Sequence, residues 1–346
     1  MSIDEASLRN VVSLMLSNHR LSIRQGCELA ESLCTQEDTF RFLLEHLGSL
    51  DTSSYLHVWS LSVLGRWDQS IIENTTELYF NDPLFLELPS CIRVFKNLKE
   101  FSIGMNCQIH SIPSWIGDLT SLEILHIDLS NSPCSTLPDT IGQLVNLQEF
   151  TLSSEKVAFL PDTMGNLSKL HTLKLDCNHC SPQLLQLPDS FARLSNLRIF
   201  EWVCAEYAIL GDWIGGLTNL SELSLQNNGI TRLPDTFGNL TNLRCLNLVD
   251  NNLSELPESF CNLKNLSNLD LFNSNALVIP SSIGALESLT HLNIEHTYQS
   301  ELPESFYNLK NLEVLYASKD DLSDETRNLI EERLPACVIS IYWSGF

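Results

Sequence analysis

Leucines recur along most of the chain in the pattern Leu-x-x-Leu-x-Leu, with polar residues at most of the positions between them. Successive side chains of a β-strand point to opposite faces, so this pattern predicts a short strand whose leucines face a core while the other residues face solvent. Ten such segments begin at Leu98, Leu122, Leu147, Leu170, Leu197, Leu220, Leu243, Leu266, Leu289 and Leu312.

A Leu-Pro dipeptide, or a near equivalent, marks the start of each return segment, as in Leu233-Pro-Asp-Thr-Phe-Gly-Asn-Leu240. These sites are Leu88, Ile112, Leu137, Leu160, Leu187, Leu210 (with Gly211 in place of proline), Leu233, Leu256, Ile279 and Leu302, at intervals of 24, 25, 23, 27 and then five times 23 residues. We expect a helical or 3₁₀ turn there, and a turn after the strand at Asn106, Asn178, Asn228 and Asn251, whose side chains can bond to nearby backbone groups. One unit cannot bury its leucines, but a stack of ten buries a continuous core.

This pattern resembles the leucine-rich repeat over residues 88–320, and Leu-Pro-x-x-Ile/Phe-Gly-x-Leu is similar to the 23-residue class of bacterial repeat proteins and plant intracellular Ras-group-related repeat proteins. The resemblance implies an α/β solenoid, a horseshoe with a parallel concave sheet. It also implies that partners dock on the concave face.

The pattern divides the chain into three parts. Residues 1–75 have helical spacing of apolar residues and predict an N-terminal cap of three or four helices, residues 76–320 hold about ten repeats, and residues 321–346 form a C-terminal cap. In that last part we expect a helix over Ser323–Leu334, capped by its serine and stopped by Pro335, and then a strand over Val338–Trp343.

The charge balance excludes several classes of function. With 43 acidic and 20 basic residues the chain carries a net charge of −23, which disfavours nucleic acid and anionic membrane as partners. The amino terminus lacks the features of a signal peptide, and no apolar run has the length of a membrane span. We expect a cytoplasmic monomer; export without a standard signal peptide is the alternative.

No Gly-rich phosphate loop, Gly-x-Ser-x-Gly or His-Glu-x-x-His motif occurs, so we expect no enzyme activity, catalytic residue, cofactor or metal. Cys177-Asn-His-Cys180 is the metal or disulfide candidate, because strand alignment places Cys177 next to Cys204. A lone Cys-x-x-Cys is weak evidence, and most of the 11 cysteines suit a buried apolar position. An enzyme that uses this cysteine cluster is one alternative function.

The solvent-facing strand positions predict where a partner binds. They carry nine acids (Glu100, Asp128, Glu149, Asp176, Glu201, Glu222, Asp250, Asp270 and Glu295) against Lys174 and Lys319, which favours a basic partner. Phe272 and Tyr316 stand out as aromatic residues of the kind that form interface hot spots. The predicted partner-binding residues are Phe272, Tyr316, Asn293, Glu295, His291, Asp270, Asn247, Glu201 and Asp176.

Seven further acids follow the Leu-Pro site, where a carboxylate suits the start of the return helix, so we assign them a structural role. The sequence thus predicts a noncatalytic scaffold or adaptor that binds a basic protein on the concave face. The alternatives are an exported bacterial effector or surface protein that binds a host protein, and a structural spacer without a partner.

Overall fold

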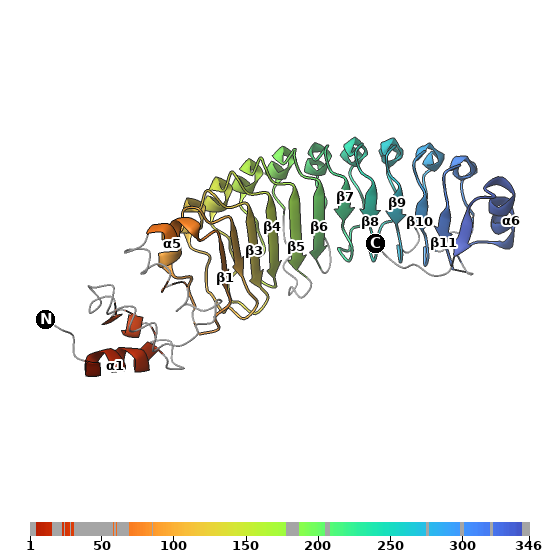
Figure 1. Cartoon of the computed structure of the whole chain (residues 1–346). Helices are drawn as coiled ribbons and strands as arrows, with labels where there is room; N and C mark the ends of the chain where they lie inside the picture. The colour runs from red at the N-terminus through yellow and green to blue at the C-terminus, as the bar shows by residue number, and fades with distance from the viewer. Residues whose placement is uncertain are drawn as a thin grey trace. The chain divides into compact units, whose positions relative to one another are not determined.

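The computed structural model describes residues 5–15, 23, 25–27, 29–30, 58, 60, 69–84, 86–177, 187–204, 208–274, 277–297, 301–318 and 321–340. The chain forms two compact units, Met1–Leu147 with Thr151–Lys156, and Gln148–Phe150 with Val157–Phe346. Strand order follows chain order from β1 to β12, and in each unit short helices lie along one side of the strands (Figure 1). The predicted α/β solenoid with a parallel sheet is confirmed.

The described part of the first unit contains α1 (Glu5–Met15), α5 (Gln69–Asn74), β1 (Glu77–Phe80), η1 (Ser90–Val94), β2 (Glu100–Ile103), η2 (Ser114–Asp118), β3 (Ile124–Leu129) and η3 (Asp139–Gln143), where η denotes a 3₁₀ helix. Strand β4 (Glu149–Ser154) has residues in both units. Strand β1 precedes the ten predicted strands, and its burial alternates as that of β2 and β3 does.

The second unit continues the alternation. Its elements are η4 (Asp162–Asn166), β5 (Thr172–Cys177), η5 (Asp189–Arg193), β6 (Ile199–Cys204), η6 (Asp212–Gly216), β7 (Glu222–Ser224), η7 (Asp235–Asn239), β8 (Cys245–Asn247), η8 (Glu258–Asn262), β9 (Asn268–Asp270), η9 (Ile283–Ala285), β10 (His291–Asn293), η10 (Glu304–Asn308), β11 (Val314–Tyr316), α6 (Asp324–Arg333) and β12 (Val338–Ser340). All ten predicted strands are present, as β2 to β11.

The strand register follows the repeat length. From β6 to β11 each residue pairs with the residue 23 positions later, as in Glu222 with Cys245 and His291 with Val314. The offset is 24 between β2 and β3 and 27 between β5 and β6. Equivalent positions of successive repeats therefore form straight rows across the strands.

The core is a stack of leucine and phenylalanine rows. The central residues of β7 to β10, Leu223, Leu246, Leu269 and Leu292, are buried, as are the return-segment residues Phe191, Ile214, Phe237, Phe260 and Phe306. Burying one such side chain stabilises the fold by about 1.5–3 kcal/mol. The repetition of these rows supplies the core that a single repeat lacks.

Glycine in the return segments allows successive 3₁₀ helices to lie one strand spacing apart. A Cβ atom on Gly238 would lie 2.3 Å from the carbonyl oxygen of Ser259 in the next repeat, and one on Gly165 would lie 2.4 Å from that of Ser190. The Gly of the Leu-Pro-x-x-x-Gly pattern is thus a packing requirement. The seven acids with an assigned structural role, Asp139, Asp162, Asp189, Asp212, Asp235, Glu258 and Glu304, each begin a 3₁₀ helix, as predicted.

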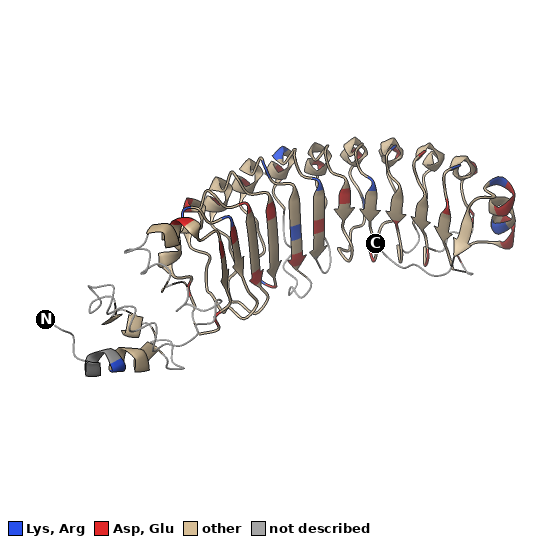
Figure 2. Ribbon diagram, viewed as in Figure 1, with Lys and Arg blue, Asp and Glu red and all other residues tan. Residues whose placement is uncertain are grey.

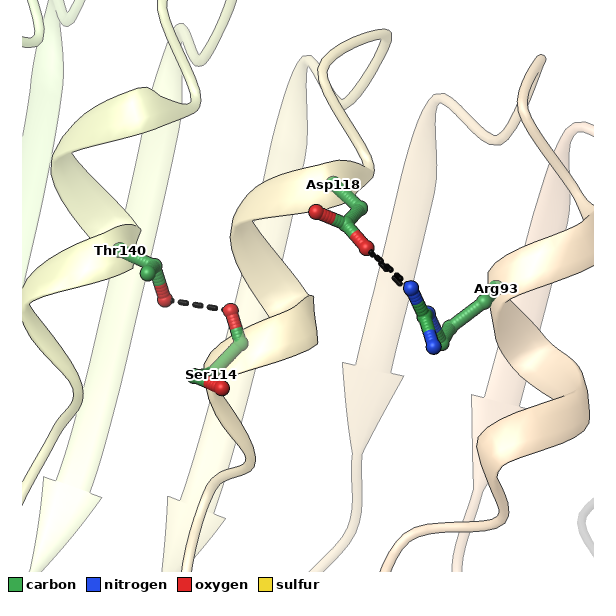
Figure 3. A network of polar contacts seen from close by, with 4 residues as sticks. All are labelled: Arg93, Ser114, Asp118 and Thr140. Carbon is green, nitrogen blue, oxygen red and sulfur yellow. Dashed lines mark hydrogen bonds and ion pairs between the residues drawn. The ribbon is translucent and has the colours of Figure 1, made fainter.

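Polar contacts join neighbouring return segments. In the first unit the guanidinium of Arg93 on η1 pairs with the Asp118 carboxylate on η2 at 2.9 Å, and the Thr140 hydroxyl on η3 donates to the Ser114 carbonyl at 2.6 Å (Figure 3). These exposed contacts orient the segments, while the buried rows carry most of the stability.

A row of asparagines that the sequence reasoning did not identify adds a second link between repeats. In seven of the ten repeats an asparagine stands just before the first strand leucine, and its Nδ2 donates to a backbone carbonyl of the preceding repeat. Examples are Asn219 to Ser195 (2.7 Å), Asn242 to Thr218 (2.8 Å), Asn265 to Thr241 (2.7 Å) and Asn311 to Glu287 (2.7 Å). Its signal in the sequence is the recurring Asn-Leu at the start of the strand pattern.

The C-terminal end matches its prediction. The Ser323 hydroxyl accepts from the Thr326 N–H at 3.1 Å and caps α6, and β12 pairs with β11. The Arg333 guanidinium pairs with Glu304 at 2.6 Å and lies 4.6 Å above the Tyr307 ring, which attaches α6 to η10. Residues 341–343 of the predicted final strand lie outside the described residues.

The helical N-terminal cap is described only in part. Helix α1 forms as expected and buries Val11 and Met15, and Ile23, Cys27 and Ala30 are also buried. Residues 31–57, where further helices of the cap are expected, lie outside the described residues. The division into residues 1–75, 76–320 and 321–346 therefore stays a prediction. Among the helices that the structure describes, none is long and apolar enough to cross a membrane.

Candidate functional site

The candidate surface is the face of the sheet opposite to the buried leucines. The strand register places the last residues of β7 to β11 in one row, which we call the central row: Ser224, Asn247, Asp270, Asn293 and Tyr316. We call this set, with the outward residues that follow each strand, the sheet face.

Strands β7 to β11 have only three residues each, and four of them are followed by a left-handed turn. The turn residues Asn227, Asp250, Asn273 and His296 have φ between 55° and 59°. Asparagine and aspartate tolerate this region better than other residues with a Cβ, and it is rare for bulky ones. The turn residues predicted from the sequence, Asn228 and Asn251, lie one position later; Asn, Asp, Asn and His at one column of the repeat are the signal for the left-handed residues.

Side chains of the central row close these turns. The Oδ1 atoms of Asn247, Asp270 and Asn293 each accept the backbone N–H two residues on, from Val249, Phe272 and Glu295, all at 3.0 Å. Because each side chain folds back on its own backbone, it no longer extends into solvent.

The expectation that all predicted partner-binding residues face solvent is therefore wrong for three of them. Asp270 is 2% exposed, Asn293 0% and Glu295 7%. The simple alternation of inward and outward residues ends at the third strand residue, where the turn begins. Residues that the alternation places in solvent are instead packed into the turn.

Burial changes the ionisation of these acids. It raises the pKa of Asp270 to about 6; the nearby charges of Glu295 and Asp250 add to the rise, and hydrogen bonds from Phe272 and Asn293 oppose it. The pKa of Glu295 is also raised, mainly by burial, with His296 opposing the rise and Asp321 adding to it.

Aromatic and imidazole side chains belong to the same strands and turns as the two acids. The half-buried Phe272 ring meets the exposed His296 ring edge-on, with centroids 5.2 Å apart. Half-buried Tyr316 is the register partner of Asn293, and half-buried His291 has its Nδ1 3.0 Å from the Thr290 hydroxyl. The structure thus brings Phe272, Asn293, Glu295, Asp270 and Tyr316 to adjacent strands, as the sequence predicted.

The turn after β10 has a partner that the sequence reasoning did not include. Asp321 is buried, and its Oδ2 accepts the backbone N–H groups of His296 and Ser318 at 3.1 and 2.7 Å. This carboxylate fixes the backbone next to Glu295.

The remaining predicted residues lie elsewhere on the face. Asp176 is exposed on β5, and Glu201 on β6 pairs with Lys174 on β5 at 2.9 Å. Half-buried Asn247 on β8 also donates to Gln226 at 3.3 Å. Acidic residues recur along the strands while basic ones are sparse (Figure 2).

The cysteine candidate is described only in part. Cys177 is buried and pairs in register with Cys204 on the next strand, whereas Cys180 lies outside the described residues. Within the described part of the chain, no group of three or more His, Cys, Asp or Glu residues is arranged to hold a metal ion.

The family model for a leucine-rich repeat region matches residues 78–235 and 233–334. The chain belongs to the leucine-rich repeat proteins. Proteins of this family are typically noncatalytic interaction scaffolds or receptors, which agrees with a face suited to binding. A search of curated proteins gives no match to this sequence.

Three solved structures are similar to this leucine-rich repeat protein. An internalin from Listeria monocytogenes is 18% identical with a TM-score of 0.56, over 81% of this chain and 86% of its own, and this likeness shows the fold alone. A leucine-rich repeat protein of Leptospira interrogans is 21% identical (TM-score 0.36, 81% and 98% covered). A plant peptide hormone receptor in complex with its hormone is 24% identical (TM-score 0.44, 68% and 46% covered).

Proposed function

We propose that this leucine-rich repeat protein is a noncatalytic scaffold or adaptor, and that a basic protein partner binds its sheet face. The observation that carries the proposal is the charge of that face. Asp176, Glu222 and Asp250 are exposed on or after β5, β7 and β8, and Asp270 and Glu295 lie just beneath the surface. Such a face attracts a basic partner over a long range and speeds the encounter.

The site supports recognition because its backbone is rigidly held. The Asn247, Asp270 and Asn293 side chains close their turns, and Asp321 fixes the next one. A surface that is ordered before binding loses little conformational entropy when the partner docks. Half-buried Phe272 and Tyr316 supply apolar contact area at two places on this frame.

Zero-length carbodiimide crosslinking in native lysate tests the proposal, because this reagent joins carboxylates of the chain directly to lysines of a partner. We expect crosslinks from Asp176, Glu222 and Asp250 to lysine-rich segments of one protein. Titration calorimetry with that protein should then show weaker binding after alanine replacement of Phe272 and Tyr316. Crosslinks confined to the 3₁₀ helices or to residues 1–75 would overturn the proposal.

The monomeric state and the cellular location belong to the same proposal. A dilution series in sedimentation velocity tests the monomer. Fractionation of the native organism separates a cytoplasmic adaptor from a protein exported without a standard signal peptide to bind a host protein.

A further inference from the structure

The sequence contains one Asn-Gly dipeptide, Asn228-Gly229, which lies in the turn that follows β7. Asparagine followed by glycine is prone to spontaneous deamidation, because glycine has no Cβ atom to hinder the attack of its own backbone nitrogen on the asparagine side chain. Asparagine is counted among the heat-labile residues of proteins. Asn228 is therefore a candidate for covalent chemistry that the proposed function does not use.

The geometry of this turn explains why glycine follows the asparagine. Gly229 has φ 60°, in the left-handed region that a residue with a Cβ atom adopts only at a steric cost. In the next repeat the equivalent residue is Asn252, which does not have positive φ, so that turn requires no glycine. The reactive dipeptide is thus a consequence of the backbone conformation after β7.

The folded chain holds Asn228 in a position that is unsuited to the reaction. The side chain is 0% exposed, and its Nδ2 donates to the backbone carbonyl of Trp202 on β6 at 2.6 Å. The backbone carbonyl of Asn228 accepts the Ala208 N–H at 2.8 Å. The reaction must move the side chain onto the Gly229 nitrogen, which breaks the bond to Trp202, and must then admit water. The fold opposes both steps.

We propose that Asn228 is a modification site which becomes reactive when the chain unfolds, and that its deamidation makes unfolding irreversible. In the unfolded chain the Gly229 backbone nitrogen gives its proton to solvent base and attacks Cγ of Asn228. A C–N bond forms, and the side-chain nitrogen leaves as ammonia. Water then opens the five-membered ring at either carbonyl and yields aspartate or isoaspartate. The reaction consumes one water, releases one ammonia and needs no other reactant.

Neither product fits the folded turn. Aspartate lacks the Nδ2 donor and places a carboxylate oxygen against the Trp202 carbonyl at a buried position. Isoaspartate carries the main chain through the side-chain carbons, which adds one methylene to the backbone of the turn. The same turn contains Gln226, which accepts a hydrogen bond from Asn247 on β8, so the damage reaches the sheet face. Chemical modification of an unfolded chain is a general cause of irreversible unfolding.

The experiment incubates the full chain in two states at the same mildly alkaline pH and temperature, folded in buffer and unfolded in guanidinium chloride. Peptide mass spectrometry measures the conversion of each asparagine. We expect Asn228 to deamidate in the unfolded chain and to react at least about a hundredfold more slowly in the folded chain, because only the small open population can react. Equal rates in the two states would overturn the inference.

Asn251 is the matched control within the same molecule. It occupies the same column of the next repeat, it is buried, and its Nδ2 donates to the Leu225 carbonyl at 2.8 Å, but Asn252 follows it instead of glycine. In the unfolded chain Asn251 should react much more slowly than Asn228. If the two asparagines deamidate equally fast there, the assignment of the site to Asn228-Gly229 is wrong.

The second half of the proposal is tested by refolding. After incubation the unfolded chain is diluted into buffer, and the refolded and unrefolded fractions are analysed separately. The refolded fraction should retain Asn228, and the unrefolded fraction should contain aspartate or isoaspartate at this position. The variant Asn228→Asp should also have a lower urea midpoint than the wild type or fail to fold, whereas the exposed change Asn252→Asp should leave the midpoint nearly unchanged. Deamidated chains that refold with the wild-type midpoint would refute this consequence.

Discussion

Strands β3 to β6 and strands β7 to β11 differ in length and in the eighth residue of the repeat, counted from the first leucine of Leu-x-x-Leu-x-Leu. Strands β3, β4, β5 and β6 have six residues each, and their eighth residues include Leu129, Ser154 and Cys177, which lie in the strand and are buried. Strands β7 to β11 have three residues, and the eighth residue of β7 to β10 is a turn residue at positive φ, such as Asn273. In β8, β9 and β10 the central-row side chain folds back onto the turn.

The difference follows the residue at the eighth position and not the length of the repeat, because six-residue β6 has the same offset of 23 to the next strand as the three-residue strands. In β7 to β10 the eighth position holds Asn227, Asp250, Asn273 and His296, all at positive φ. Asparagine and aspartate tolerate the left-handed region better than leucine, so the strand can end there. The early turn buries Asp270, Asn293 and Glu295.

The largest effect is expected where a turn residue is placed in a six-residue strand. Leu129→Asn puts an amide into a fully buried position and should lower the free energy of unfolding by about 3–4 kcal/mol. Urea unfolding measures the loss, with the exposed Asn131→Ala change as its control. A loss below about 1 kcal/mol would mean that β3 can end early, as β7 does.

Asn251 tests the turn of a three-residue strand. Its Nδ2 donates to the carbonyls of Leu225 (2.8 Å) and Leu248 (2.9 Å), and its Oδ1 accepts from the Ile230 N–H at 2.9 Å. Asn251→Ala leaves these buried groups without partners and should destabilise the protein by about 3 kcal/mol. The exposed neighbour Asn252→Ala should change the urea midpoint little, and equal effects would refute this role.

The free energy of unfolding should depend on pH because of Asp270, which ends the three-residue strand β9. Its folded pKa, about 6, lies above its ordinary value of 3.8, so the folded state binds the proton more tightly. The stabilising contribution is complete below pH 3.8 and is lost as pH rises through about 6. We compare the free energy of unfolding of Asp270→Asn with that of the wild type at each pH. The difference should shift in favour of the variant by about 2 kcal/mol between pH 4 and pH 7. Urea unfolding at both pH values measures this, with Glu222→Gln as the charge control.

Two substitutions of Asn273 test whether the turn after β9 requires the left-handed backbone conformation. They have the smallest expected effect on the free energy of unfolding. Asn273→Leu places a bulky residue at φ 56° and should destabilise the protein by about 1–2 kcal/mol, whereas Asn273→Gly should be nearly neutral. Thermal unfolding of the two variants compares them directly. A stable leucine variant would show that the turn does not require the left-handed conformation.

Much of the fold was predictable because its signals are local and repeated. The Leu-x-x-Leu-x-Leu segments predict β2 to β11, and the acids after Leu-Pro mark the starts of the 3₁₀ helices. Ser323 and Pro335 predict the two ends of α6. The sequence predicts which residues of the candidate site lie on adjacent strands, because the strand register follows from the repeat. It does not predict how exposed their side chains are. Alternation places Asp270 and Glu295 in solvent, and only the turn geometry shows that they are buried.

The sequence by itself determined the solenoid, the strand rows, the acidic sheet face and the structural C-terminal helix, because each depends on spacing between residues that are near one another in the chain. The tertiary structure decided where each strand ends, which asparagines link one repeat to the next, and that Asp270 and Glu295 are buried. Those features depend on the distances between repeats, and the backbone of one repeat alone does not set them.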